Sequence, residues 1–386
     1  MTSPGAVRRV FLIVIDSLGV GALPDAERFG DAGAHTLDHV AAAAGPLEVP
    51  WLVALGLGSV PGVNSLPRPD RPRGSHGRMA ERSPGKDTPT GHWELMGCVL
   101  DAPFPTFPDG FPPHLIESLV RDAGLPGVLG NVPASGTEIL ERLGAESVET
   151  GRPIVYTSAD SVLQVAAHAE RFGLERLYGV CEVARELTRP LGLGRVIARP
   201  FVDAAPGAPT RFARTYDRRD WALEPPRETA LDRLHAAGVP TVGVGKIGDI
   251  FAGRGLSASL HSEGDRDAMR LTLEQARGLE QGLVFTNLVD FDSLFGHRRD
   301  AQGYARNLEA LDRDLAALEP LLGPEDLLLL TADHGNDPTW PGSDHTREYV
   351  PLLEWSPGRT RGEALGTFET FAEVARRTEA WLVGTS

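Results

Sequence analysis

The order of apolar and polar positions along the chain predicts strands that alternate with helices. Residues 8–19, "RRVFLIVIDSLG", are a short apolar run typical of a buried strand, which stops at Asp16 and enters a glycine-containing turn. Two later segments, "LVFTNLVDFD" (283–292) and "DLLLLTADHG" (326–335), are likewise apolar runs that end in carboxylates. Helical spacing of apolar residues is found in residues 227–237, 267–280, 303–322 and 369–382.

This alternation predicts an α/β fold built on a doubly wound, mostly parallel sheet. In such sheets, ligands bind beyond the carboxyl ends of the strands. The three acidic strand ends are therefore expected to converge at one edge.

The middle of the chain has a different composition. Between residues 101 and 223 it is rich in proline and glycine, as in "DAPFPTFPDGFPP" and "RPFVDAAPGAPTR", and it has its own short strand and helix patterns. We predict that residues 101–223 form a smaller α/β domain, inserted into a core domain made of residues 1–100 and 224–386.

Charge and composition narrow the setting. The net charge of −15 argues against nucleic acid or an anionic membrane as a partner. The apolar run at residues 10–15 is too short for a signal peptide or a membrane span. The two cysteines, Cys98 and Cys181, lack the spacing of a metal or redox motif. These features predict a cytoplasmic protein of enzyme size.

Aspartate and histidine side chains gather at the predicted strand ends and on the irregular segment "TADHGNDPTWPGSDHTRE" (331–348). Each such residue alone is more often a helix cap or turn former, so only the whole set argues for a metal site. Asp290 and Asp292 alternate on the predicted strand, so the pattern does not decide between them. The candidate ligands are Asp16, Asp292, His297, Asp333, His334 and His345. Such a set suits two divalent ions, as in phosphoryl-transfer sites.

A candidate nucleophile lies in "GKDTPTGHWELMG" (85–97), which contains Thr88 and Thr90. A threonine hydroxyl becomes a nucleophile when a metal or a base activates it. Pro89 is expected to exclude a helix through Thr88. The alternative interpretation is a threonine that caps a helix starting near His92.

The motifs together resemble those of the phosphopentomutases, which belong to the alkaline phosphatase superfamily. The resemblance runs from about residue 9 to residue 371. The segments that carry it are "VIDSLGVGALPDA", "GKDTPTGHWELMG", "YTSADSVLQVAAH", "VGVGKIGDIF", "NLVDFDSLFGHRRD" and "TADHGNDPTWPGSDHTREYVP". It implies a core of alkaline phosphatase type with two Mn²⁺ ions, and an inserted cap domain that binds a sugar phosphate.

Carried over by position, the resemblance implies that Asp16, Asp333 and His334 bind one ion. Asp292, His297 and His345 would bind the other, because the spacing in "DSLFGH" matches Asp292 rather than Asp290. Thr88 would be the residue that is phosphorylated. The implied sugar-phosphate ligands are Ser158, Asp160, Val162, Arg195, Ile197, Arg214 and Lys246.

The implied reaction interconverts ribose or deoxyribose 1-phosphate with the 5-phosphate through a 1,5-bisphosphate, linking nucleoside breakdown to pentose metabolism. Activation by glucose 1,6-bisphosphate or ribose 1,5-bisphosphate is expected. A cofactor-independent phosphoglycerate mutase is disfavoured, because it uses a serine in a different motif. A phosphatase of the same superfamily is a further alternative. A non-catalytic metal-binding module would not require a nucleophile loop.

Overall fold

The chain divides into two compact units in the computed structural model, which describes residues 8–158, 161–205, 207 and 210–384. Unit 1 consists of residues 1–103 and 225–386, and unit 2 is the contiguous stretch Phe104–Glu224. Each unit has its own sheet. The two units are therefore described separately.

An eight-stranded sheet forms the centre of unit 1, in the order β10-β9-β11-β1-β12-β13-β2-β14. The strands are β1 (Arg9–Ile15), β2 (Ser75–Met79), β9 (Thr241–Val244), β10 (Ala258–Leu260), β11 (Gly282–Leu288), β12 (Asp326–Thr331), β13 (Val350–Trp355) and β14 (Ala364–Phe368). Strand β1 is parallel to both β11 and β12, whereas β13 is antiparallel to its two neighbours. The predicted mostly parallel α/β sheet is thus confirmed.

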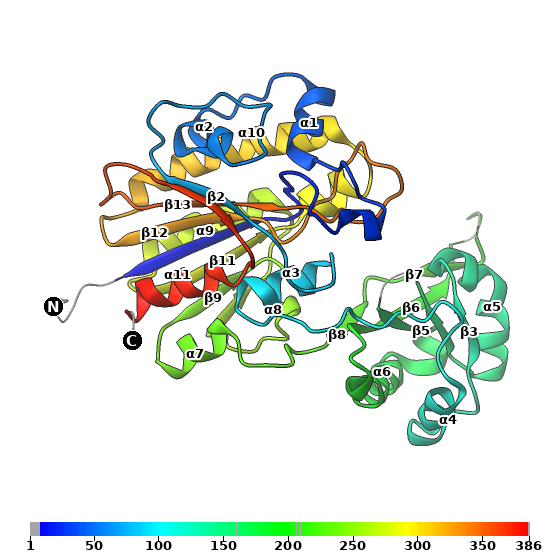
Figure 1. The fold of residues 1–386 in the computed structure, drawn as a ribbon. Helices are drawn as coiled ribbons and strands as arrows, with labels where there is room; N and C mark the ends of the chain where they lie inside the picture. The colour runs from blue at the N-terminus through cyan, green and yellow to red at the C-terminus, as the bar shows by residue number, and fades with distance from the viewer. Residues whose placement is uncertain (1–7, 159–160, 206, 208–209, 385–386) are drawn as a thin grey trace. The chain divides into compact units, whose positions relative to one another are not determined.

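Helices cover both faces of this sheet (Figure 1). One layer contains α1 (Thr36–Ala44), α2 (Pro50–Leu55), α9 (Asp265–Gly278) and α10 (Ala301–Leu318). The other contains α3 (Thr88–Leu95), α7 (Ala230–Ala236), α8 (Ile247–Ile250) and α11 (Glu373–Leu382). Neighbouring residues of β11 show the two sides, since Thr286 bonds Thr272 of α9 and Asn287 approaches His92 of α3. This is the doubly wound arrangement.

Helix α3 begins earlier than the sequence pattern suggested. It starts at Thr88, not near His92, and its cap is Asp87, whose side chain accepts a hydrogen bond from Thr90 N. Pro89 is compatible with the helix because it lies in the first turn, where its missing N–H would have had no partner in the helix. Thr88 is therefore held at a helix N-terminus.

The segment after β11 also differs from the prediction. The strand ends at Leu288, and a π-helical turn, η5 (Phe291–Gly296), follows. Asp290 precedes this turn, where its backbone N–H donates to the carboxylate of Asp265 in α9 and its own carboxylate accepts from the backbone N–H of Asp265. The interpretation that Asp290 and Asp292 lie on one strand and face the same side was wrong. The chain turns before it reaches them.

Unit 2 is an α/β unit built on a six-stranded sheet. Its strands are β3 (Leu129–Pro133), β4 (Ile154–Thr157), β5 (Val162–His168), β6 (Arg195–Asp203), β7 (Phe212–Arg214) and β8 (Arg219–Ala222). Helices α4 (Pro113–Asp122) and α6 (Leu174–Thr188) enclose one apolar core with the sheet, and α5 (Gly136–Thr150) encloses a smaller one on the other face.

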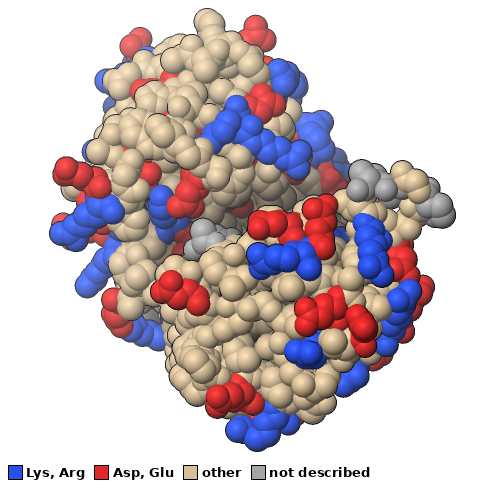
Figure 2. Space-filling model, turned by 90° about the vertical axis from the view of Figure 1, so that its right-hand side faces the viewer, with Lys and Arg blue, Asp and Glu red and all other residues tan. Residues whose placement is uncertain are grey.

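The surface has no dominant sign of charge in the view of Figure 2, where basic and acidic side chains of the described residues are interspersed. None of the helices in the described part of the chain combines the length and apolar composition needed to cross a bilayer.

Candidate metal centre

Three acidic side chains meet at one edge of the unit 1 sheet. Asp16 directly follows β1, Asp333 lies just beyond β12, and Asp292 lies on the turn after β11. Because β1 is parallel to both other strands, their carboxyl ends lie at the same edge. The three residues are buried, with exposed fractions of 0%, 0% and 5% in that order. The predicted convergence of acidic strand ends is present.

A buried histidine joins two of these carboxylates to the candidate nucleophile. His334 Nε2 lies 3.4 Å from Asp16 Oδ1 and 3.3 Å from Asp333 Oδ2. Thr88 Oγ1 lies 3.2 Å from the same nitrogen. The threonine hydroxyl therefore points at the carboxylate cluster from the first residue of α3.

The other two histidines approach Asp292. His297 Nε2 lies 3.2 Å from Asp292 Oδ2, and His345 Nε2 lies 3.4 Å from Asp292 Oδ1. Ligand atoms of Asp292, His297 and His345 all lie within 4.8 Å of one another, and the same holds for Asp16, Asp292 and His334. Asp292 thus belongs to both groups, and Asp333 lies beside the second one, with its Oδ2 3.3 Å from His334 Nε2.

Burial tends to raise the pKa of all three carboxylates, but the histidines facing Asp292 and Asp333 lower the pKa values of those two. Burial raises the pKa of Asp16 well above its usual value, and the charge of Asp333 raises it further. Burial alone would lower the pKa of His334, but Asp333 and Asp16 raise it to about 9. Without a metal, a proton on His334 therefore offsets part of this charge at neutral pH.

Buried ligand atoms at the centre lack partners. Asp16 Oδ1, Asp333 Oδ2 and His345 Nε2 make no well-aligned hydrogen bond with any described residue. Such atoms are rare in folded proteins and require an explanation. Carboxylate oxygens and imidazole nitrogens are ligands for divalent ions such as Mn²⁺ and Zn²⁺. The residues at this edge fit a divalent metal centre.

Backbone contacts turn the histidines toward the cluster. His297 Nδ1 lies 2.7 Å from the carbonyl of Ser343, and His334 Nδ1 lies 3.1 Å from that of Gly335. A carbonyl only accepts, so each Nδ1 carries the proton and each Nε2 is left for a ligand. Asn336 Nδ2 donates to Asp292 Oδ1 at 2.7 Å and fixes that carboxylate.

The sequence interpretation missed two buried residues that brace the loops. The Glu348 carboxylate accepts hydrogen bonds from Gly21 N and from the backbone and side chain of Thr36. A Cβ on Gly19 would lie 2.2 Å from Glu348 Oε2, so only glycine fits there. Arg347 pairs with Glu81 and bonds the carbonyls of Ser83 and Gly85, a few residues before the candidate nucleophile Thr88. In the sequence, two adjacent charged residues directly follow "DHT", and this feature could have identified them.

Two lysines lie near this edge. Lys86 Nζ is 3.0 Å from the buried Asp31 Oδ2 and 3.1 Å from the exposed Asp344 Oδ2. Lys246 is exposed and follows β9, which is parallel to β11. Its charge lowers the pKa of Asp16, as the smallest of the influences on that group.

In unit 2, several of the predicted sugar-phosphate ligands share one face of the sheet. Arg195 and Ile197 alternate on β6, and Val162 of β5 pairs with Arg195. Arg214 reaches the start of α5, where a Cβ on Gly136 would lie 1.5 Å from its Nη2. Ser158 follows β4, whereas Asp160 lies outside the described residues.

Further basic groups on this face were not predicted. Arg199 continues the alternation of β6, and its Nε donates to Gln164 Oε1 at 3.0 Å. Burial raises the pKa of Tyr156, while the charges of Arg214 and Arg199 act in the opposite direction. These groups concentrate positive charge on one face of a strongly acidic protein. Because side chains two residues apart on a strand share a face, the position of Arg199 after Arg195 and Ile197 would have identified it.

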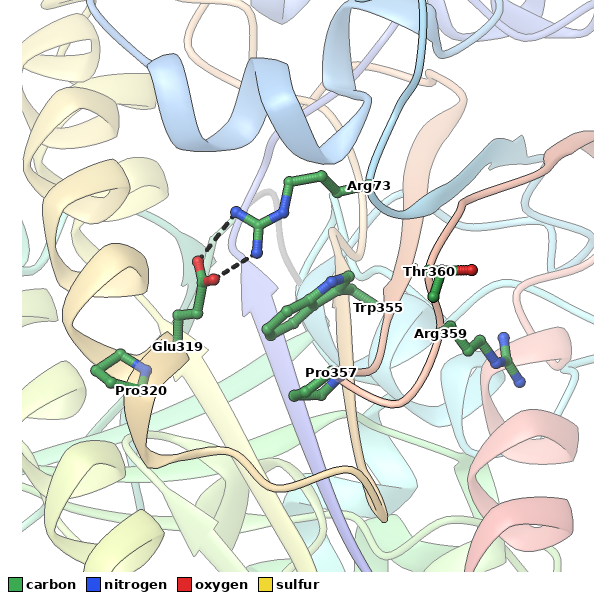
Figure 3. A pocket seen from close by; sticks show the side chains of 7 residues that line it. All are labelled: Arg73, Glu319, Pro320, Trp355, Pro357, Arg359 and Thr360. Carbon is green, nitrogen blue, oxygen red and sulfur yellow. Dashed lines mark hydrogen bonds and ion pairs between the residues drawn. The ribbon is translucent and has the colours of Figure 1, made fainter.

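A cavity of about 350 Å³ lies at the other end of the unit 1 sheet (Figure 3). It includes Trp355, which pairs with Leu328 near the start of β12. Its charged side chains are already matched, because Arg73 forms an ion pair with Glu319 and Arg359 with Glu354. This cavity does not share the unpaired character of the metal centre.

Comparison with known proteins places the chain in a class. Residues 8–381 match the model of the Metalloenzyme superfamily, so the chain belongs to that superfamily. Its fold is similar to that of PH0037 from Pyrococcus horikoshii, with a TM-score of 0.50, 15% identity and 99% of each chain covered.

Closer relatives define the family. The chain is 55% identical over 367 residues to a phosphopentomutase of Anaeromyxobacter sp. (strain K), covering 95% of this chain and 93% of the relative. It is 55% identical over 380 residues to a phosphopentomutase of Symbiobacterium thermophilum, covering 98% and 95%. The chain belongs to the phosphopentomutase family and is an enzyme of the isomerase class.

Proposed function

We propose that the protein interconverts ribose or deoxyribose 1-phosphate with the corresponding 5-phosphate through a phosphothreonine at Thr88. The observation that carries this proposal is the placement of Thr88 Oγ1, 3.2 Å from His334 Nε2 at the edge of the carboxylate cluster. The activity fits a cytoplasmic role in nucleoside breakdown, where such sugar phosphates are formed.

Two bound divalent ions, which we propose are Mn²⁺, would neutralise charge on the oxygens of the transferring phosphoryl group. Asp16, Asp333 and His334, with Asp292, His297 and His345, would hold them. Thr88 itself carries the phosphoryl group at the N-terminus of α3, where the positive end of the helix dipole favours an anion.

The transfer proceeds in two steps. In the first, the Oγ1–P bond of phosphorylated Thr88 breaks as a P–O bond forms with the free hydroxyl of the sugar phosphate. The hydroxyl proton ends on Thr88, and the product is the 1,5-bisphosphate. In the second, the bisphosphate presents its other phosphate, which returns to Thr88 while the proton returns to the sugar oxygen.

We propose that Arg195, Arg214 and Lys246 are ligands of the sugar phosphate, with contacts from Ser158, Asp160, Val162 and Ile197. Arginine suits this task because its planar fork binds two phosphate oxygens at once. Arg214→Ala is expected to raise KM by about tenfold or more, as for the loss of a charged hydrogen bond. The content of bound Mn²⁺ should stay unchanged.

The decisive experiment compares two threonines of the same helix. Thr88→Ala should abolish conversion of deoxyribose 5-phosphate, and no added bisphosphate should restore it. Thr90→Ala is the matched control, because Thr90 is fully buried and its hydroxyl bonds Asp87 at 2.7 Å. That variant should lose stability yet keep a phosphorylatable Thr88, as peptide mass spectrometry would show.

Priming separates a mutase from a hydrolase. Enzyme with unmodified Thr88 should be inactive until a catalytic amount of glucose 1,6-bisphosphate or ribose 1,5-bisphosphate is added with Mn²⁺. Sugar 1-phosphate and free phosphate are followed together. Release of free phosphate at the rate of substrate loss, without sugar 1-phosphate, would refute the proposal and establish a phosphatase.

A further inference from the structure

A histidine and an asparagine lie directly behind the metal centre, and both are fully buried. Asn287 Nδ2 donates to Asp16 Oδ2 at 2.9 Å and lies 3.3 Å from His92 Nε2. His92 Nδ1 lies 3.0 Å from Asp333 Oδ2 and 3.0 Å from the carbonyl oxygen of Thr88. Polar contacts thus run from one carboxylate through two side chains to the other carboxylate and the nucleophile.

Chemistry fixes the direction of these contacts. The amide nitrogen of Asn287 only donates, so the oxygen of Asp16 that it contacts is the acceptor. The second proton on that nitrogen can bond His92 Nε2 only if Nε2 is bare. The proton of the neutral imidazole therefore lies on Nδ1, where it bonds the Thr88 carbonyl and lies beside Asp333 Oδ2 at 3.0 Å.

Packing keeps the His92 ring in place. Its ring is stacked on Phe285, with centroids 5.9 Å apart and planes at 25°. The preceding residue, Gly91, lies so close to the strand end that a Cβ would be 2.1 Å from the Asp333 carbonyl oxygen. Helix α3 therefore packs directly on the end of β12, and the ring has little room to turn away.

We propose that His92 and Asn287 are positioning residues that orient Asp333 and Asp16 for metal binding and hold the Thr88 backbone against the same centre. The metal-binding part depends only on the residues at the sheet edge. The part that concerns Thr88 rests on the function proposed above. Partners behind a ligand typically affect metal affinity by about 10- to 100-fold.

Two opposite replacements of His92 test the proposal. In His92→Asn, the amide nitrogen occupies the place of Nδ1, so a donor toward Asp333 remains. In His92→Gln, the amide occupies the place of Nε2, so only the contact with Asn287 remains. Titration of the purified metal-free protein with Mn²⁺ should give a dissociation constant raised about tenfold or more for His92→Gln, but less than about threefold for His92→Asn.

A third variant and a control address the other end of the contacts. Asn287→Leu keeps the volume but leaves Asp16 without its donor, so it should also weaken Mn²⁺ binding about tenfold. Thr286→Val is the matched control, because Thr286 is the neighbouring buried residue on β11 and bonds Thr272 on the opposite face. It should lower the unfolding midpoint of the metal-free protein without changing Mn²⁺ affinity.

The proposal is overturned if His92→Gln and Asn287→Leu bind Mn²⁺ within twofold of the unmodified protein. It is also overturned if His92→Asn and His92→Gln lose equal affinity together with equal stability, since that pattern indicates simple packing. Should Asn287→Leu fail to fold, the two His92 variants decide the matter. Absence of mutase activity in the unmodified protein would refute the proposed function, yet these Mn²⁺ titrations would still judge the positioning role.

Discussion

The two ends of the unit 1 sheet differ in how completely their charged side chains are paired. At the carboxyl ends of β1, β11 and β12, three buried carboxylates face mainly histidines, and buried ligand atoms of Asp16 and Asp333 have no well-aligned partner. At the other end, Glu319 is paired with Arg73 (Figure 3). Glu354 is paired with two arginines, Arg359 and Arg377.

This difference separates a binding site from a structural contact. Buried charge is costly unless it is paired, so buried carboxylate oxygens that lack a well-aligned partner favour a cation from outside. A cavity whose charges are matched internally needs none. Although the cavity at the arginine end has a volume of about 350 Å³, the metal-binding end is the one with the chemical demand for a ligand.

The largest effect is expected from removing the carboxylate common to both candidate metal groups. Asp292→Ala should abolish binding of both ions and lower activity by about a thousandfold or more, since metal ions supply several kcal/mol of transition-state stabilisation. Asp290→Ala is the control, because its carboxylate faces α9 instead. Metal content by elemental analysis checks this. Retention of two ions in Asp292→Ala would contradict the assignment.

The next effect concerns a matched pair at the metal-binding end. Arg347 and Glu81 have side chains that are only 3% and 2% exposed, and the same guanidinium bonds the Ser83 carbonyl. Arg347→Ala leaves Glu81 buried without its cation and should lower the free energy of unfolding by about 3–5 kcal/mol. Arg376→Ala removes an exposed arginine, and its partner Glu373 keeps a second cation in Arg377, so this change should cost less than about 1 kcal/mol. Denaturant unfolding measures both changes. Equal losses of unfolding free energy in the two variants would contradict the role of burial.

A pH dependence should follow from His334. Its pKa is raised to about 9 from the usual 6.5, so the metal-free protein carries this proton at neutral pH. Mn²⁺ must displace it, and affinity should therefore rise by up to about tenfold per pH unit until pH approaches 9. Calorimetry in buffers of different ionisation enthalpy measures the released proton. Affinity that stays constant from pH 6.5 to 9 would contradict this expectation.

The raised pKa of His334 also affects the stability of the metal-free protein, which should fall, not rise, with increasing pH. Because the folded pKa of His334 lies above its unfolded value, its stabilising contribution is complete below about pH 6.5 and is lost as pH rises through about 9. Metal-free protein should therefore lose this contribution over that range. Mn²⁺-loaded protein should not, since the ion replaces the proton.

The smallest effect is expected at the matched end of the sheet. Arg73 and Glu319 are 41% and 32% exposed, so their ion pair is screened by solvent. Arg73→Leu should change the free energy of unfolding by at most about 1 kcal/mol and leave Mn²⁺ affinity unaltered. A loss of metal binding in this variant would show that the two ends are not independent, and it would break the comparison.

The sequence alone predicted much of the sheet and the residues at its metal-binding edge. Continuous apolar runs identified β1, β11 and β12 because parallel strands are buried on both faces. The carboxylates stood out because each follows such a run. Asp292 could be separated from Asp290 only through the family resemblance, since no local pattern announced the π-helical turn between them.

Other features had weaker signals. His92 lies in a helix and Asn287 in a strand, so both read as ordinary polar residues of regular elements. Asn287 was detectable in principle, as a polar side chain inside the run "LVFTNL" with no turn to explain it. The contact between the two depends on which strand lies beside α3. Spacing along the chain does not contain that information.

The insertion of unit 2 has a consequence for synthesis on the ribosome. Strand β1, near the N-terminus, takes its place between β11 and β12, whose first paired residues are Gly282 and Asp326. Strand β1 therefore cannot pair with these strands, and its apolar side chains stay uncovered, until most of the chain has left the exit tunnel. Unit 2 is contiguous and has its own sheet and apolar cores, so it can form during that time. The smaller unit is then the first to mature, and the metal centre is among the last parts of the molecule to assemble.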